Sequence, residues 1–202
     1  MAPVELNLNG YTDLPKGKVA YVVTYLEMPQ KPDVGASERS DIAFERWEDP
    51  SRDEFRALFR EIGEDWLWYS RLTISDEKLD GLLNDPHRQI YAPIVNGRRV
   101  GLLELNFRSR ENVEISFFGL VPSTVGGGVG RWMMAKAMEL AWSHAETRRV
   151  WLHTCTGDSP QAIHFYQSCG FRPFKRAIEV MDDPRLSGHV PMDKGRHVPL
   201  IA

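Results

Sequence analysis

Residues 125–131 read VGGGVGR and place four glycines within five consecutive positions. Glycine has no Cβ, so neighbouring backbone N–H groups can converge on a ligand that approaches closely. An apolar run, VEISFFGLVP, precedes this segment, and a helix-like stretch, RWMMAKAMELAW, follows it. The N-terminus of a helix adds partial positive charge at the same place. The segment is therefore predicted to bind a phosphate or a diphosphate.

Two common phosphate-binding motifs do not account for this segment. A P-loop needs Gly-Lys followed by Ser or Thr, whereas Gly130 is followed by Arg131 and Trp132. The dinucleotide-binding motif G-x-G-x-x-G needs a glycine where Met133 stands, and it belongs in the first strand–helix turn of a domain. A third pattern, strand–(Q/R)-x-x-G-x-G/A–helix, fits the spacing of residues 125–130.

Local patterns predict the elements that must position this segment. Phe55, Leu58, Phe59 and Ile62 repeat at helical spacing, with a capping box at Ser51, which predicts a helix within 49–63. The turn residues Asn96–Gly97 predict a type I′ hairpin between the apolar runs on either side. Further strands are predicted at 18–28, 113–121, 149–156 and within 172–181, and further helices at 75–85, 130–146 and 159–171. The order β, αα, βββ, α, β, α indicates a mixed α/β sheet.

The third pattern is where the chain resembles a known family, the GNAT superfamily of acetyl-CoA-dependent N-acetyltransferases. In addition to the glycine loop, SPQAIHFYQSCGF at 159–171 resembles the family segment N-x-A-x-x-(F/Y)-Y-x-x-x-G-F. The similar residues cover roughly 90–175. Two positions depart from the pattern, because Val125 replaces the usual Gln or Arg and Ser159 replaces the usual Asn. The resemblance implies an α+β GNAT-like fold, with a mixed central sheet of about six to seven strands flanked by helices.

The resemblance also implies acetyl-CoA as a co-substrate, with its diphosphate on the glycine loop. In the family two central parallel strands splay apart, and the pantetheine arm binds there to backbone groups, here expected at Leu120 and Val121. No metal is expected, because the six histidines lack metal-ligand spacing with carboxylates. The expected cofactor contacts are Leu120, Val121, Val125, Gly126, Gly127, Gly128, Val129, Gly130, Arg131, Ser159 and Tyr166.

Acetyl transfer to an amine requires a proton acceptor for the ammonium group and a proton for the departing thiolate. The resemblance implies Tyr166 as the acid, with a packed core aromatic as the alternative. It implies Glu114 or Glu104 as the base, and solvent-facing strand residues are the alternative for both. Simple alternation along 113–121 places Glu114 on one face with Ser116, Phe118 and Leu120. His164 is a further candidate proton carrier.

The segment EDWLWYSR at 64–71 joins the two predicted N-terminal helices. In the family this segment forms a wall of the acceptor pocket, so Trp66, Trp68 and Tyr69 are predicted to bind the substrate, and core packing is the alternative. Cys155 lies within a predicted strand and is interpreted as a packed thiol, since direct transfer needs no nucleophile on the protein.

Composition narrows the class of protein. The chain has 202 residues, a formal net charge of −3 and only two cysteines, which excludes a general nucleic-acid surface and a disulfide framework. No run of residues is long and apolar enough for a membrane span, so a cytoplasmic protein is expected. One GNAT-type domain is predicted at 1–182, with a C-terminal extension at 183–202.

These observations leave three hypotheses. The first is an N-acetyltransferase that moves an acetyl group from acetyl-CoA to a primary amine, on a small molecule or a peptide, by direct attack in a ternary complex. The second is a catalytically silent module that binds acetyl-CoA as a sensor or scaffold. The third is a partner-binding role for 183–202, such as a homodimer contact that completes the pocket.

Overall fold

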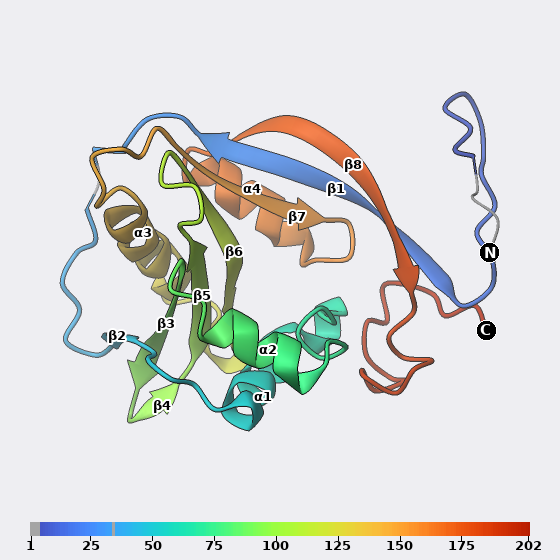
Figure 1. The fold of residues 1–202 in the computed structure, drawn as a ribbon, viewed down its shortest axis with the longest axis horizontal. Helices are drawn as coiled ribbons and strands as arrows, with labels where there is room; N and C mark the ends of the chain where they lie inside the picture. The colour runs from blue at the N-terminus through green and yellow to red at the C-terminus, as the bar shows by residue number, and fades with distance from the viewer. Residues whose placement is uncertain (1–4, 34) are drawn as a thin grey trace.

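One sheet of eight strands runs through the protein, with helices on both faces (Figure 1). The computed structural model describes residues 5–33 and 35–202. The strands are β1 Lys18–Met28, β2 Ala43–Arg46, β3 Arg88–Val95, β4 Arg98–Arg99, β5 Gly101–Asn106, β6 Asn112–Leu120, β7 Arg149–Cys155 and β8 Arg172–Asp182. The helices are α1 Arg52–Gly63, α2 Asp76–Leu83, α3 Val129–Ala141 and α4 Pro160–Ser168, with short 3-10 turns η1 Glu64–Trp66 and η2 Pro122–Thr124.

The strand order is β2-β3-β5-β6-β7-β1-β8, and β4 pairs with β3. The first strand in the described chain, β1, lies between β7 and β8 and runs antiparallel to both. Segments from the two ends of the sequence therefore lie side by side, as Figure 1 shows for the blue and orange ribbons. Among the strands of the described residues, only β6 and β7 pair in parallel. The predicted mixed α/β fold is confirmed, and the sheet has eight strands where six to seven were expected.

Local capping and turn residues act as predicted. The Ser51 hydroxyl accepts a hydrogen bond from the Glu54 amide at 3.3 Å and begins α1. Asn96 and Gly97 have φ values of 49° and 75°, as a type I′ turn requires. The helix predicted at 130–146 ends earlier, at Ala141, and Ala145 is exposed beyond it. The stretch before α1, for which no strand was predicted, contributes β2.

The alternating side chains of β5 divide the core between the two faces of the sheet. Leu102 packs with α1 residues such as Phe55, whereas Leu103 packs with α3 residues such as Met134. Tyr166 of α4 packs in the same cluster as the α3 residues, so α4 lies on the same face of the sheet as α3. The α1 side of the sheet carries the segment that was predicted to hold the acceptor.

Residues 183–202 pack onto the rest of the chain and do not project from it as a loose tail. Arg185 is buried and donates to both carboxylate oxygens of Asp183, at 2.9 and 2.6 Å. Its Nη1 also donates to the carbonyl oxygen of Val198 at 2.9 Å. Val190 lies within the core on the α1 side. Arg185 therefore holds the extension in a compact loop. In the described residues, no helix has the length and apolar character that a bilayer crossing requires.

Candidate active site

Strands β6 and β7 pair for only three residues and then separate. The parallel register runs from Asn112 opposite Arg149 to Glu114 opposite Trp151. Beyond this point the two strands form opposite walls of a cavity of about 670 Å³. Backbone groups along the open edges have no neighbouring strand to pair with, so they are available to a ligand. The splay that the family resemblance implied is confirmed.

A bulge in β6 decides which side chains face this cavity. Glu104 lies opposite Phe117 on the neighbouring strand, but Leu105 lies opposite Ile115, so one residue of β6 is extra. The bulge breaks the alternation. Glu114 shares a face with Phe117, and Phe118 packs on the opposite side against Phe165 and Tyr166. The prediction that Glu114 shares a face with Phe118 and Leu120 was therefore wrong.

The two candidate bases lie in different environments. Glu104 is only 2% exposed and does not line the cavity. Its Oε1 accepts from Arg71 Nη2 at 3.0 Å and from Arg88 Nη1, so the carboxylate is held in a buried ion pair away from the cavity. This corrects the assignment of Glu104 as a candidate base. Glu114 is half-buried and lines the cavity, and its Oε2 accepts from Asn106 Nδ2 at 3.0 Å.

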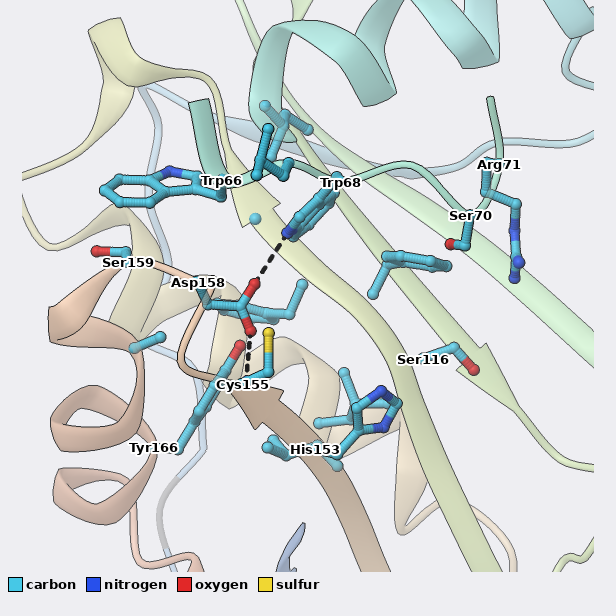
Figure 2. A pocket seen from close by; sticks show the side chains of 18 of the residues that line it. Trp66, Trp68, Ser70, Arg71, Ser116, His153, Cys155, Asp158, Ser159 and Tyr166 are labelled. Carbon is cyan, nitrogen blue, oxygen red and sulfur yellow. Dashed lines mark hydrogen bonds between the residues drawn. The ribbon is translucent and has the colours of Figure 1, made fainter. Parts of the chain in front are cut away.

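Tyr166 belongs to the core and to the cavity at once. The residue is 9% exposed, and its ring packs edge-on against Phe118 and Phe171. Figure 2 shows its hydroxyl pointing toward Asp158 and Cys155. Burial, and secondarily the negative charge of Asp158, raises the pKa of the phenol well above its usual range. The hydroxyl therefore stays protonated and can give its proton only to a strong base.

The three aromatic residues predicted for the acceptor pocket all line the cavity. Trp68 Nε1 donates to Asp158 Oδ1 at 3.1 Å (Figure 2), and the Tyr69 hydroxyl donates to Glu179 Oε1 at 2.9 Å. Trp66 packs against His197 of the C-terminal extension. Each ring is thus held by a partner far away in the sequence, which gives the cavity a fixed wall.

Asp158 is a site residue that sequence reasoning missed. Its Oδ2 accepts from Thr154 Oγ1 at 2.7 Å and from the Cys155 amide at 2.9 Å, while Oδ1 holds Trp68. Asp158 therefore ties the turn between β7 and α4 to the aromatic wall. The only sequence signal was an Asp directly before Ser-Pro, which is typical of an ordinary turn.

Two other candidate groups have little capacity for proton transfer or attack. Cys155 lines the cavity, but burial, together with the charge of Asp158, raises the pKa of its thiol to about 12. A thiol with so high a pKa is a poor nucleophile, in agreement with its interpretation as a packed residue. His164 is exposed on α4 and does not line the cavity, so it is not placed to carry a proton there.

The glycine loop has the backbone shape of an anion cradle. Gly126, Gly127 and Gly128 have φ values of 106°, 54° and 77°, a run that side chains rarely adopt. Nothing lies within 4 Å of a Cβ placed on any of them, so the loop is open on the outside. Their amides have no hydrogen-bond partner among the described residues. The first turn of α3 begins directly behind them and adds its own unpaired N–H groups.

The position of the loop is set by Arg39, whose Nη1 donates to the carbonyl oxygen of Gly127 at 3.0 Å. The same guanidinium forms an ion pair with Asp41. Arg39 binds the loop through the carbonyl oxygen of Gly127, so the loop is held in place while its amides stay free for a ligand. Val125, which is 70% exposed, connects the loop to the cavity lining.

The remaining predicted cofactor contacts divide into two groups. Leu120 and Ser159 line the cavity, although the Ser159 hydroxyl donates to Gln161 Oε1 at 2.8 Å. Val121 is fully buried, its amide donates to Val100 O at 2.9 Å and its carbonyl accepts from Thr124, so it is not available to a ligand. This corrects the prediction for Val121.

The contacts predicted beyond the glycines face away from the cavity. The Arg131 side chain reaches the end of α4, where its Nη2 donates to Ser168 Oγ at 3.0 Å. The Val129 side chain is buried beside Trp132, and its amide donates to Gly126 O at 3.3 Å. Gly130 and Arg131 therefore offer only their first-turn amides. In the described part of the chain, no three side chains form a group that could hold a metal ion.

This fold and loop agree with comparisons to known proteins. A family model described as the acetyltransferase (GNAT) family matches residues 38–171, more than half of the chain. The chain therefore belongs to the GNAT acetyltransferase family. The matched residues include the glycine loop, Glu114 and Tyr166, whereas β1 and β8 lie outside them.

Solved structures share the fold at low sequence identity. A GCN5-related N-acetyltransferase from Kribbella flavida is 17% identical, with a TM-score of 0.55 over 85% of this chain and 63% of its own. A tandem GNAT protein from the clavulanic acid biosynthesis pathway is 15% identical, with a TM-score of 0.57 over 90% of this chain and 62% of its own. An acetyltransferase from Thermus thermophilus is 19% identical, with a TM-score of 0.52 over 69% of this chain and 96% of its own.

The chain thus spans less than two thirds of the length of the first two of these structures. Among curated proteins, no sequence match to the chain was found.

Proposed function

We propose that this protein is an N-acetyltransferase that transfers an acetyl group from acetyl-CoA to a primary amine by direct attack in a ternary complex. One observation carries the proposal. The cavity between the splayed strands β6 and β7 is lined by Val125 at the glycine loop, by Trp66 and Trp68 of the aromatic wall, and by Tyr166 of α4. A thioester carrier and an amine acceptor could thus meet beside one protonated phenol.

The free groups of the loop fit a diphosphate. Unpaired amides at Gly126, Gly127 and Gly128 lie next to the N-terminus of α3, and open space surrounds them. The exposed edge of β6 near Leu120 suits the amide groups of a pantetheine arm, which would bind as an added strand. When bound, acetyl-CoA supplies an acetyl group that is already activated as a thioester.

The side chains around the cavity would perform the proton transfers. Glu114 lines the cavity as a half-buried carboxylate and would accept a proton from the ammonium form of the acceptor, directly or through water. Tyr166 would donate a hydrogen bond to the sulfur and would transfer its proton only late in the step, as thiolate charge develops there. Cys155 would stay protonated, and this favours direct attack over an acyl-enzyme intermediate.

A substitution in the loop tests the proposal. In Gly128→Glu, a carboxylate occupies the place expected for the diphosphate, so we expect coenzyme A binding to become undetectable by isothermal titration calorimetry. Gly188→Glu is a matched control, because Gly188 has a φ of 74° against 77° for Gly128 and equally open surroundings. Both substitutions carry the same strain and add the same charge, so only the location differs. Equal affinity in the two variants would refute the cofactor site.

Thiol release with a panel of primary amines then separates transfer from binding alone. Turnover that depends on the amine supports the enzyme. Tight binding of acetyl-CoA without turnover for any amine would instead favour the silent module, which the departures at Val125 and Ser159 also suggest.

A further inference from the structure

Two arginines line the end of the cavity that lies away from the glycine loop. Arg71 comes from the segment between η1 and α2, and Arg88 begins β3. Their side chains are only 12% and 14% exposed. Figure 2 shows Arg71 near Ser116, on the opposite side of the cavity from Tyr166 and Ser159. We call Arg71, Arg88 and Ser116 the arginine end of the cavity.

At the arginine end, the two guanidinium groups have a single carboxylate within hydrogen-bond distance. Both guanidinium groups share the carboxylate of Glu104. Asp85 lies 3.8 Å from Arg88 Nε, beyond hydrogen-bond distance, and is bound at 2.8 Å by Arg108. At this end of the cavity, two buried guanidinium groups thus share one carboxylate at hydrogen-bond distance.

The hydrogen-bond donors at this end are also incompletely used. The Nε atoms of Arg71 and Arg88 are buried without a hydrogen-bond partner. Within the described residues, Arg71 Nη1 and Arg88 Nη2 have no partner either. The Arg71 guanidinium lies over the Phe117 ring at 4.7 Å, which fixes its plane. Arg149 Nε, in the ion pair with Glu27, is also buried without a partner, and what distinguishes Arg71 and Arg88 is that they line the cavity, where a ligand can reach them.

We propose that the amine acceptor also carries a carboxylate, which binds at the arginine end while the amine lies toward Glu114 and Tyr166. This inference rests on the proposed function and names its substrate class, a small amino-carboxylate. A carboxylate matches the planar fork of a guanidinium. A carboxylate adds a single negative charge to a cavity end that already holds Glu104 and has Glu114 in its lining, whereas a phosphate monoester would add about −1.5 to −2 at neutral pH. Glu114 would complement the ammonium group at the other end of the same ligand.

The test compares each amino-carboxylate with its own carboxamide, which has the same shape and no charge. The panel comprises the α-amino acids and a series from β-alanine to 6-aminohexanoate, with thiol release as the readout. We expect the preferred carboxylate to exceed its amide by roughly 10- to 100-fold in kcat/KM, the range for charge-assisted hydrogen bonds. The preference should lie mainly in KM, because the contact is remote from the reacting atoms.

Substitutions test whether the preference for carboxylates over amides arises at the arginine end. Arg71→Gln should bring the carboxylate-to-amide ratio close to one, and Ser116→Ala should lower it while leaving the ion pairs with Glu104 intact. Arg98→Gln is a matched control, since Arg98 is exposed on β4 and pairs with Glu61 outside the cavity. It removes the same charge and should leave the ratio unchanged. A ratio that falls equally in Arg98→Gln would overturn the inference.

Binding is measured separately from turnover, by the shift in Tm that each ligand causes in the protein saturated with coenzyme A. If carboxylates and amides are equal in both rate and Tm shift, the inference is wrong, although transfer to amines would leave the proposed function standing. A preference for 2-aminoethyl phosphate over β-alanine would also refute it. If coenzyme A itself fails to bind, the proposed function fails first, and a carboxylate-specific Tm shift in the free protein would still support the arginine end.

Discussion

Tyr166 combines a packed ring with a hydroxyl that reaches the cavity, and its role as the acid is a proposal. Its ring fills the space between Phe118 and Phe171, and its hydroxyl reaches the cavity. Tyr166→Phe keeps the ring and removes the hydroxyl group, and with it the proton that the proposed mechanism uses. We therefore expect kcat to fall by about 10²-fold or more, with little change in the affinity for coenzyme A. An unchanged kcat would assign Tyr166 to the core alone.

The raised pKa of Tyr166 also has a consequence for stability at high pH. An unfolded tyrosine loses its proton near pH 10, whereas the buried one holds it to higher pH. Above pH 10 the unfolded state therefore binds fewer protons than the folded state, so stability falls as the pH rises. Denaturant unfolding at pH 9 to 11 should show a less steep loss in Tyr166→Phe than in the wild type.

We expect opposite effects from substitutions at the two glutamates, Glu114 and Glu104. Glu114→Gln should lower kcat/KM for the amine, most strongly at low pH where the amine is hardest to deprotonate, and leave stability and coenzyme A affinity unchanged. Glu104→Gln should mainly destabilise the fold, by roughly 3–5 kcal/mol, because it leaves Arg71 buried without a counter-charge and Arg88 with only Asp85, at 3.8 Å. Unfolding in guanidinium chloride measures the loss of stability in Glu104→Gln. Thiol release across a range of pH measures the loss of kcat/KM in Glu114→Gln. The assignment fails if Glu104→Gln folds normally and shows the pH-dependent defect.

At the scale of elements, the position of α1 on β6 sets the aromatic wall. Gly119 lies beneath α1, and a Cβ there would overlap Ile62 Cγ2 and lie 3.0 Å from Trp68 Cη2. The glycine thus permits the close approach that holds Trp68 against the cavity. The β6 bulge, two residues earlier, turns Phe117 toward the same helix, where it packs edge-on against Phe59.

Gly119→Ala should therefore destabilise the protein by about 1–3 kcal/mol and raise KM for the amine, because Trp68 must move. Gly81→Ala is a matched control on α2, where nothing lies within 4 Å of the added Cβ. There the same change should stabilise by roughly 0.5–1 kcal/mol, since glycine is unfavourable within a helix. Thermal unfolding and amine kinetics on both variants check the pair, and a stabilised Gly119→Ala would contradict this description of the wall.

At the scale of the whole molecule, the C-terminal extension completes one side of the site. Gly195 packs directly on Leu67, and His197 Nε2 lies 2.8 Å from Gly157 O beside Asp158. Trp66 packs against the same histidine. The extension therefore supports both the aromatic wall and the turn that carries Asp158. A dimer contact through 183–202 remains a proposal, for which mass in solution is the direct measurement.

The buried pair of Arg185 and Asp183 should control whether the extension stays in place. Arg185→Ala leaves Asp183 buried and unpaired, so we expect a loss of roughly 3–5 kcal/mol and rapid proteolysis within 186–202, detected by mass spectrometry. The double variant Asp183→Asn, Arg185→Met removes both charges and should lose less. Equal losses in the two variants would show that the ion pair is not the determinant.

Acid should loosen the same contact. Burial alone would raise the pKa of Asp183, but the hydrogen bonds and charge of Arg185 lower it on balance below 3.8. The stabilisation is therefore complete above that pH and is lost only as the pH falls through the lowered value.

The sequence by itself determined the features that depend on near neighbours. The helix within 49–63, the turn at Asn96–Gly97 and the glycine cradle before α3 follow from hydrophobic period, capping and allowed φ values, all of which act over a few residues. The order of elements around the glycine loop was predictable for the same reason. The class of ligand that free amides at a helix N-terminus would bind was inferred on the same local grounds and stays a prediction.

Only the tertiary structure decided which distant residues meet. The bulge between Glu114 and Phe117 reversed the face of Phe118, and Arg71 and Arg88 turned Glu104 from a candidate base into an ion-pair partner. Asp158 acquired its role by meeting Trp68, 90 residues away, and β1 found its place between β7 and β8. The physical reason is the same in each case. Local propensities act along the chain, whereas pairing, burial and charge compensation are settled only when remote segments compete for the same neighbours.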